Sequence, residues 1–240
     1  MADDDVFLSR VTHDLRGELA TMVAGIHYLL RYESGIGESG RQMLDRVNGA
    51  GQRLRRLLDE LELSAWIDGA PANAVLQLEP CRLDTAVHAA VGRLERSIAQ
   101  RRATVEIEVP AEVPEIEIDP EIFGAALEHA IDFAVARSVD KTARVTAAIA
   151  DGAPVLRITD EGGSLDQAAL ARIFQPFAEK DLVPRPEPGA RRRERLGLGL
   201  AIARGIAAAH GGTLTAVSTP GGVEMTLTLR GPGCRPPPAV

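Results

Sequence analysis

The sequence predicts an α+β protein: an N-terminal helical hairpin that forms a dimeric four-helix bundle, followed by an α/β-sandwich domain. Two patterns carry this prediction. Residues 3–67 repeat apolar side chains at steps of three and four, the period of a helix that buries one face. Residues 75–229 alternate strand-like and helical runs, which is typical of a mixed sheet covered by helices on one face. We expect domains at 1–68 and 75–230, a linker at 69–74 and a disordered, proline-rich tail at 231–240.

The hairpin follows from two long periodic runs. The first helix is expected from Asp3–Asp5 to Glu33, since acidic residues suit a helix N-terminus. Ser34–Gly40 has the composition of a turn, and the second helix is expected from Arg41 to Ile67. Two long helices with a short connection form an antiparallel pair that leaves part of each apolar stripe uncovered. A second copy of the hairpin would cover the stripe as a four-helix bundle; the alternative is that the downstream domain covers it.

Turn-forming residues divide the second half into short elements. We expect helices over 83–101, 120–137, 167–174 and 198–210, and strands over 75–78, 104–109, 115–118, 144–150, 155–159, 213–218 and 223–229. Asp119-Pro120 marks a helix start, because aspartate caps a helix and proline suits its first turn. Residues 177–195 form a charged, proline-bearing, lid-like loop. His210 ends a helix, where a positive imidazole is favoured.

Composition restricts the class of protein. Of the 240 residues, 45% are hydrophobic and 25% charged, an ordinary globular balance. A net charge of −7 argues against a general nucleic-acid binder. No stretch approaches the ~20 apolar residues of a membrane span, and the start MADDDV lacks a signal-peptide pattern. Cys81 and Cys234 show no metal-ligand or disulfide spacing. We therefore expect a cytoplasmic protein without membrane insertion.

A histidine stands directly before a carboxylate in the first helix. His13 and Asp14 fall off the apolar seam, so the imidazole is expected at the solvent edge. A histidine in a phosphate relay needs that position, because its ring nitrogen must reach a phosphoryl group while a neighbouring carboxylate accepts the other proton. Taken alone, the pattern is more often an amphipathic helix with one surface histidine.

Two glycine clusters suit a nucleotide. Asp160–Gly163 (DEGG) follows a predicted strand, where an aspartate can accept a hydrogen bond from the amino group of adenine and glycines let the backbone pass close to the ring. Leu196–Leu200 (LGLGL) opens a helix, where free N–H groups and the helix dipole favour phosphate. Phe174–Phe177 (FQPF) lies between them. Each cluster alone also fits an ordinary turn.

Together, RVTHDLRGEL, TDEGG, IFQPF and RLGLGLAIARGIAAAHGG resemble, in order and spacing, the boxes of the sensor histidine kinases of two-component signalling. The resemblance covers nearly all of residues 6–230. It implies a dimerisation and histidine-phosphotransfer hairpin and an ATP-binding domain of the gyrase/Hsp90/kinase type, with His13 as phosphoacceptor and Asp14 as its acid/base neighbour. ATP and Mg²⁺ are the implied ligands, and the implied nucleotide-binding residues are Asp160, Gly162, Gly163, Phe177, Arg195, Gly197, Leu198, Gly199, Leu200 and His129.

Several boxes depart from the family pattern. The asparagine box, about NLLxNAxKY, aligns with HAIDFAVAR, so the magnesium-binding asparagine falls on Phe133, which cannot ligate a metal, and the tyrosine falls on Arg137. The metal ligands are therefore left open. His129 is either a core-edge residue or a substitute metal or phosphate contact. In the first box, Gly17 replaces the Thr or Asn that usually positions a water for dephosphorylating a response regulator.

The resemblance implies autophosphorylation of His13 from ATP and transfer to an aspartate on the receiver domain of a response regulator. The candidate docking residues are Arg16, Glu18, Arg53 and Arg56. The alternative is a degenerate kinase that acts as an ATP-independent histidine phosphotransfer or docking protein, or as a scaffold that pairs with another kinase through the hairpin. A Ser/Thr kinase of the same superfamily acting as an anti-sigma factor is disfavoured, since those proteins lack the hairpin.

Overall fold

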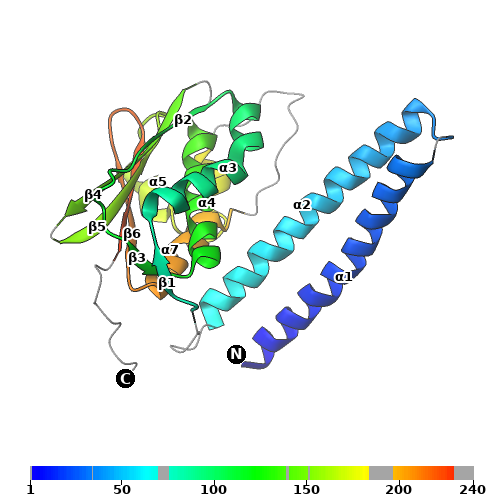
Figure 1. The fold of residues 1–240 in the computed structure, drawn as a ribbon, viewed down its shortest axis with the longest axis horizontal. Helices are drawn as coiled ribbons and strands as arrows, with labels where there is room; N and C mark the ends of the chain where they lie inside the picture. Colours follow the sequence, from blue (N-terminus) through cyan, green and yellow to red (C-terminus); the bar gives the residue numbers. More distant parts are fainter. Residues whose placement is uncertain are drawn as a thin grey trace. The chain divides into compact units, whose positions relative to one another are not determined.

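The computed structural model describes residues 2–33, 35–69, 76–138, 141–150, 152–183 and 197–229. Within these ranges, the side chains of residues 2–14, 52, 53, 56, 59, 60, 62, 64–69 and 180 are outside the description. The chain divides into two compact units, one made of two long helices and one built around a mixed sheet (Figure 1). The protein is therefore α+β, as predicted.

The helical unit is an antiparallel hairpin of α1 (Ala2–Tyr32) and α2 (Glu38–Gly69) (Figure 1). Leu19, Ile26 and Leu58 are buried between the helices. A side chain at Gly51 would press on Val23, its Cβ lying 2.8 Å from the valine Cγ2, so this glycine allows close approach. Other apolar side chains of the hairpin stay exposed, among them Leu15, Met22, Met43, Val47 and Leu54. One hairpin thus covers only part of its own apolar surface.

The second unit contains a five-stranded sheet in the order β2-β4-β5-β7-β6. Its strands are β2 (Thr104–Glu108), β4 (Thr142–Ala150), β5 (Ala153–Thr159), β6 (Thr213–Ser218) and β7 (Val223–Thr228). β2 runs parallel to β4, whereas all other neighbours are antiparallel, so the predicted mixed sheet is confirmed. The register sets Ile158 opposite both Val145 and Met225, and all three side chains are buried. Their common face is the core side of the sheet.

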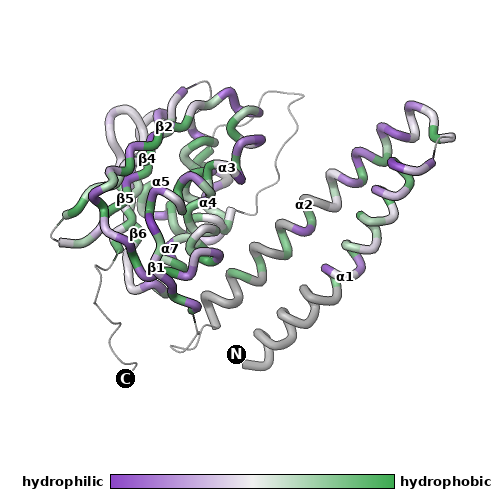
Figure 2. The backbone as a smooth tube through the Cα atoms, in the orientation of Figure 1, coloured by the Kyte–Doolittle hydropathy of each residue, from purple (hydrophilic) through white to green (hydrophobic). Residues whose placement is uncertain are grey.

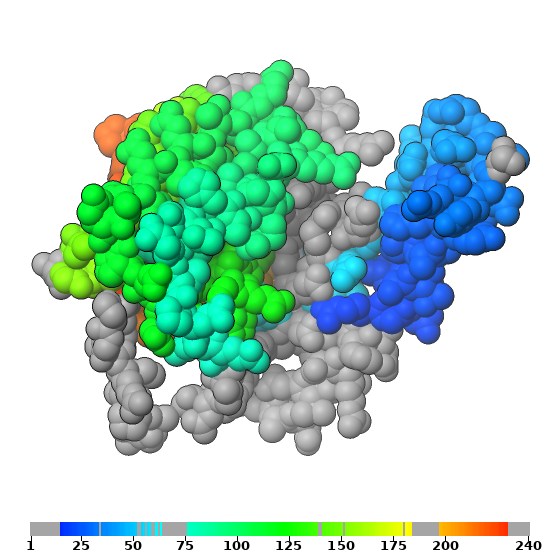
Figure 3. Space-filling model, viewed as in Figure 1, coloured from blue at the N-terminus to red at the C-terminus, as the bar shows by residue number. Residues whose placement is uncertain are grey.

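Three helices cover that face: α3 (Leu83–Arg101), α4 (Pro120–Arg137) and α7 (Gly199–Ala209) (Figure 1). α4 packs against both α3 and α7, and its mostly hydrophobic colouring in Figure 2 agrees with the burial of Phe123, Ile131 and Phe133. On the face seen in Figure 3, α3 forms a large part of the surface of this unit. α4 is therefore the central helix, and it carries the segment that aligns with the asparagine box.

The start of α4 follows the prediction. Asp119 caps the helix, since its Oδ1 accepts a hydrogen bond from the Ile122 N–H at 3.2 Å, and Pro120 occupies the first turn. The same carboxylate accepts from the backbone N–H of Gln77. Tertiary contacts thus fix both the direction of α4 and the chain that enters β1.

Two short elements differ from expectation. The strand expected at 75–78 is misplaced: β1 is Glu79–Cys81, and it pairs with β3 (Ile116–Ile118) in a separate two-stranded sheet. Its position is set by this partner, because three residues are too few to show an alternating pattern of their own. The expected loop after Phe177 contains a further short helix, α6 (Glu179–Leu182), and α5 (Gln167–Arg172) precedes it.

The expectation of a positive His210 is wrong. Its Nδ1 donates to the carbonyl of Ile206 at 2.9 Å, and its Nε2 accepts from the backbone N–H of Asp119 at 3.1 Å. An imidazole that accepts at Nε2 is neutral. Burial lowers the pKa of His210 below its usual value and outweighs the opposing effects of Ile206 and Asp119. Desolvation therefore prevails over the favourable position at the helix end.

Candidate functional site

The candidate phosphoacceptor lies in the hairpin. His13 and Asp14 are within α1, but their side chains are outside the described part of the chain, so their exposure stays a prediction. Glu18 is exposed and Arg16 half-buried on the next turn, while the side chains of Arg53 and Arg56 on α2 are not described. The candidate docking residues thus lie on both helices of the hairpin.

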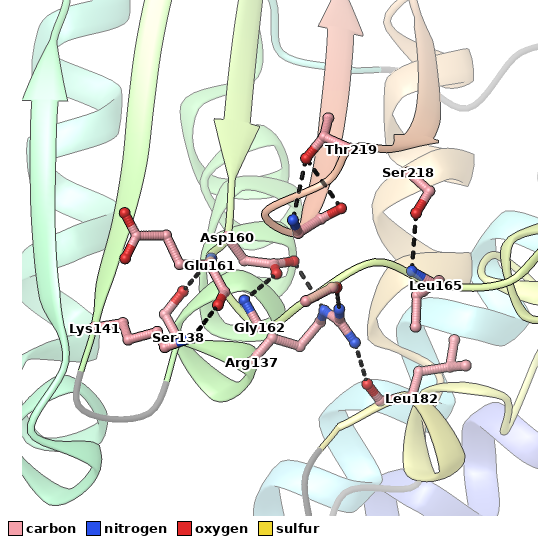
Figure 4. Close-up of polar contacts among 12 residues, drawn as sticks. Arg137, Ser138, Lys141, Asp160, Glu161, Gly162, Leu165, Leu182, Ser218 and Thr219 are labelled. Atoms are coloured by element: carbon pink, nitrogen blue, oxygen red, sulfur yellow. Dashed lines mark hydrogen bonds and ion pairs between the residues drawn. The ribbon is translucent and has the colours of Figure 1, made fainter.

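Asp160 directly follows β5 and is almost completely buried (Figure 4). Its Oδ1 accepts from the Gly162 N–H at 2.8 Å and its Oδ2 accepts from Arg137 Nε at 2.9 Å. Its own N–H donates to the carbonyl of Val223 on β7, so the sheet holds the residue in place. Burial raises the pKa of the Asp160 carboxyl above its usual value, with Gly162 and Arg137 acting in the opposite direction. Both oxygens of the predicted adenine contact thus already accept hydrogen bonds from the protein.

Arg137 is the last residue of α4 and the centre of a buried polar cluster (Figure 4). Besides Asp160, its guanidinium donates to the carbonyl of Leu182 at 2.6 Å and to the carbonyl of Gly163. It also stacks over the ring of Phe133, 5.8 Å from the ring centre. One side chain therefore ties α4 to β5, to the first glycine cluster and to α6.

The backbone of the first glycine cluster passes close to the backbone of Arg137. A Cβ at Gly162 would lie 2.7 Å from both the Cβ and the carbonyl oxygen of Arg137, so a side chain at 162 has no room. Gly163 has a φ of 87°, a left-handed conformation that favours glycine. The glycines were expected to let the backbone pass close to the adenine ring. In this structure they let it pass close to Arg137.

The position that aligns with the magnesium-binding asparagine is apolar. Phe133 is fully buried, and the nearby carboxylates of α4 face α3: Glu128 pairs with Arg93, and Asp132 accepts from Ser97 Oγ at 2.6 Å. Among the residues that the structure describes, no group of three His, Cys, Asp or Glu side chains could hold a metal ion. The described residues around Phe133 therefore do not fit a Mg²⁺ site of the family type.

The second glycine cluster begins α7. Phe177, which is 55% exposed, donates its N–H to the carbonyl of Gly197 at 2.7 Å. Both residues have positive φ, 69° and 82°, which is unusual for a phenylalanine. The contact joins the start of the segment expected to be a lid, 177–195, to the glycine shortly after its end; residues 184–196, among them Arg195, lie outside the described part of the chain.

The N-terminus of α7 holds a carboxylate. Glu179, only 3% exposed, accepts the backbone N–H of Leu200 at its Oε1. A Cβ at Gly199 would lie 2.8 Å from His129 Nδ1 and 3.0 Å from the same Oε1, so these two side chains meet over the start of the helix. Leu198, Gly199 and Leu200 are buried. Of the predicted phosphate contacts, the structure brings together His129, Gly199 and Leu200.

Sequence reasoning did not assign Glu179 a role or Arg137 a bond to Asp160. For Arg137, the signal was a lone charge at the end of the apolar run FAVAR, at the position of the family's tyrosine. For Glu179, the signal was a carboxylate two residues after Phe177, at the start of the charged loop that leads to the second glycine cluster. Neither signal specifies a partner.

Residues 120–233 match the family described as histidine kinase-, DNA gyrase B- and HSP90-like ATPase. The sensor protein DivL of Caulobacter vibrioides is 28% identical over 236 residues, covering 98% of this chain and 29% of DivL. The sensor histidine kinase MtrB of Mycobacterium tuberculosis is 27% identical over 225 residues, covering 93% and 38%. The chain thus spans about a third of the length of these curated relatives.

Solved structures share the fold. Full-length ShkA in complex with AMPPNP superimposes with a TM-score of 0.75 at 22% identity, covering 92% of this chain and 45% of ShkA. The histidine kinase AdeS of Acinetobacter baumannii gives 0.62 at 18% identity, covering 92% and 98%. Among the described helices, none combines the length and apolar character needed to cross a membrane.

Proposed function

Because the chain belongs to the sensor histidine kinases and carries their type of ATP-binding domain, we propose that it is a catalytic core of two-component signalling. It binds ATP, phosphorylates His13 and passes the phosphoryl group to an aspartate of a receiver domain. The observation that supports this best is α4, which contacts both candidate nucleotide regions. Its last residue reaches Asp160 after β5, and His129 lies at the start of α7.

The chemistry assigned to the hairpin is two successive transfers. An imidazole nitrogen of His13 attacks the γ-phosphorus of ATP as the bond to the bridging oxygen of ADP breaks, and Asp14 accepts the proton of the other nitrogen. A receiver aspartate then attacks the phosphorus, and the phosphorus–nitrogen bond breaks. No step is assigned to Mg²⁺, since Phe133 and the described carboxylates do not fit it.

The architecture proposed for this function has a phosphotransfer hairpin at 1–68, a linker at 69–74, an ATP-binding domain at 75–230 and a tail at 231–240. Two hairpins form a homodimeric four-helix bundle, supported by exposed apolar residues such as Met22, which is 63% exposed, and Met43, which is 59% exposed. We place the protein in the cytoplasm, with a response regulator as partner and a separate sensor as its source of input.

Labelled ATP tests the proposal directly. Acid-labile label should appear on the full chain and disappear in His13→Ala, whereas His27→Ala, on the same helix, should keep it. A wild-type chain that takes no label from ATP would contradict the autokinase.

The second candidate is ATP-independent phosphotransfer, and one observation bears on it. Arg137 already binds the Asp160 carboxylate, which is the predicted adenine contact. In that case His13 takes its phosphoryl group from a phosphorylated receiver domain. Incubation with such a domain should then label wild type and not His13→Ala, while ATP labels neither.

A further inference from the structure

Two protein side chains make the contacts that the resemblance assigns to the two ends of a nucleotide. Arg137 donates to Asp160, where the amino group of adenine is expected to donate. Glu179 accepts from the N–H of Leu200, where a phosphate oxygen is expected to accept. The site therefore holds a donor at its base end and an anion at its phosphate end, both supplied by the chain itself.

The contact at the base end is buried and held by several hydrogen bonds. The side chains of Arg137 and Asp160 are 3% and 0% exposed, and the guanidinium donates to three acceptors, two in the first glycine cluster and one at Leu182. A planar fork with several donors suits such a site far better than a point charge would. Gly162 makes room for it, because any side chain there would clash with Arg137. This is unlike an exposed surface ion pair such as Arg144–Glu106, in which both side chains remain nearly half exposed.

The contact at the phosphate end is also buried. A carboxylate near the first turn of a helix is stabilised by free N–H groups and the helix dipole, as a phosphate would be. Glu179 is buried there and lies beside His129. An incoming phosphate would bring a second negative charge to a position that already holds one, which is unfavourable in a buried site.

One short segment contacts both ends of the site. We call residues 177–183 the strap. Its first residue, Phe177, donates to the carbonyl of Gly197, Glu179 accepts from Leu200, and the carbonyl of Leu182 accepts from Arg137. The strap therefore connects the base end to the phosphate end, and displacing it removes protein contacts at both.

Building on the proposed function, we propose that Arg137 and the strap hold the nucleotide site in a self-occupied state, and that ATP enters only when Arg137 leaves Asp160 and Glu179 leaves α7. Nucleotide binding is then coupled to release of the strap. The apparent affinity falls in proportion to the fraction of molecules that are open, so a site open in about 1% of molecules binds about 100-fold more weakly. A ligand or partner that holds the strap in place would therefore lower the kinase activity, and one that displaces it would raise the activity.

The test measures ADP binding to the full chain by calorimetry. Arg137→Tyr restores the residue of the family pattern, and Glu179→Gln removes the charge while keeping the shape. Each is expected to tighten ADP binding by about tenfold or more, and the double variant by more than either alone. Arg144→Ala, which breaks an exposed arginine–carboxylate pair outside the site, is the matched control and should match wild type. Equal affinities for wild type, Arg137→Tyr and Glu179→Gln would overturn the proposal.

A second measurement does not depend on the folding of a variant. Backbone amides of the strap should exchange hydrogen faster when the wild-type chain is saturated with ADP than when it is free. Equal or slower exchange in the presence of bound ADP would overturn the proposal. The outcome is separable from the autokinase: tighter ADP binding without label on His13 leaves the self-occupied site standing and removes the proposed function, whereas strong labelling with unchanged affinities does the reverse.

Discussion

Arg137 Nε lies 2.9 Å from Asp160 Oδ2, and the two side chains are buried together between the end of α4 and the end of β5. The net gain in stability from a buried pair of this kind is small, because the desolvation of both charges offsets their attraction. Removal of one partner is strongly destabilising, because it leaves the other charge desolvated and unpaired. The same bond therefore bears on stability and on access to the nucleotide site.

Arg137→Ala is expected to lower the free energy of unfolding by about 3–5 kcal/mol at pH 7. The loss should shrink at acid pH. Without the guanidinium, the already raised pKa of Asp160 rises further, and below that pKa the neutral carboxyl has no unpaired charge to bury. Urea denaturation across pH measures both effects. Arg144→Ala, which breaks an exposed pair, should change stability far less, and equal losses in both variants would contradict the assignment.

The lowered pKa of His210 predicts a second pH dependence of the free energy of unfolding. Its pKa is lowered in the folded state, so the unfolded chain binds more protons and stability falls as the pH drops through the unfolded pKa, from about pH 7 towards pH 5. His210→Gln should be less stable than wild type at pH 7.5, because it loses the pair of bonds to Ile206 and Asp119, but its stability curve should be flatter in that window. A His210→Gln curve as steep as that of wild type between pH 7 and pH 5 would contradict this assignment.

Phe133→Asn tests the alignment of α4 with the asparagine box. The change replaces a fully buried ring by an amide and should cost about 3–5 kcal/mol of stability. In folded protein at low temperature, it should make ADP binding stronger with Mg²⁺ than without. Phe133→Leu, which keeps the site apolar, should show no metal dependence. An absence of metal dependence in folded Phe133→Asn would refute the alignment.

Gly17 offers a site for gain of function. A Cβ there meets nothing within 4 Å, so Gly17→Thr fits without strain and restores the polar residue of the family pattern. We expect the loss of phosphate from a phosphorylated receiver domain to speed up by at least about tenfold, which corresponds to roughly 1.4 kcal/mol. Gly25→Thr, with equal space two turns further along α1, is the matched control. Equal rates for the two variants would remove the proposed role of position 17.

The exposed apolar face of the hairpin predicts a dimer. Met22→Glu and Leu54→Glu each put a charge on this face, where burial of an apolar side chain is worth about 1.5–3 kcal/mol. Both should shift the molar mass measured by sedimentation from dimer to monomer. Ile149→Glu, at a comparably exposed apolar residue of the other unit, should leave it unchanged. A monomeric wild type at micromolar concentration would contradict the four-helix bundle.

Local signals predicted most of the fold. The helices at 83–101 and 120–137 agree with α3 and α4, and Asp119-Pro120 starts α4 as expected. Helical and strand periods, caps and turns depend on neighbouring residues, so they can be read from one chain. The position of β1 and the existence of α6 were missed, because elements of three or four residues carry no period and depend on distant partners.

By itself, the sequence determined the order of the boxes, the apolar Phe133 at the magnesium position and an arginine, Arg137, at the position of the family's tyrosine. Only the tertiary structure decided which groups these residues meet. Arg137 binds a residue 23 positions away, and Glu179 binds one 21 positions away. Such pairs form because the sheet and α4 bring distant segments together in a buried space, where each charge must find a partner to offset its desolvation. Local sequence patterns do not specify which partner that is.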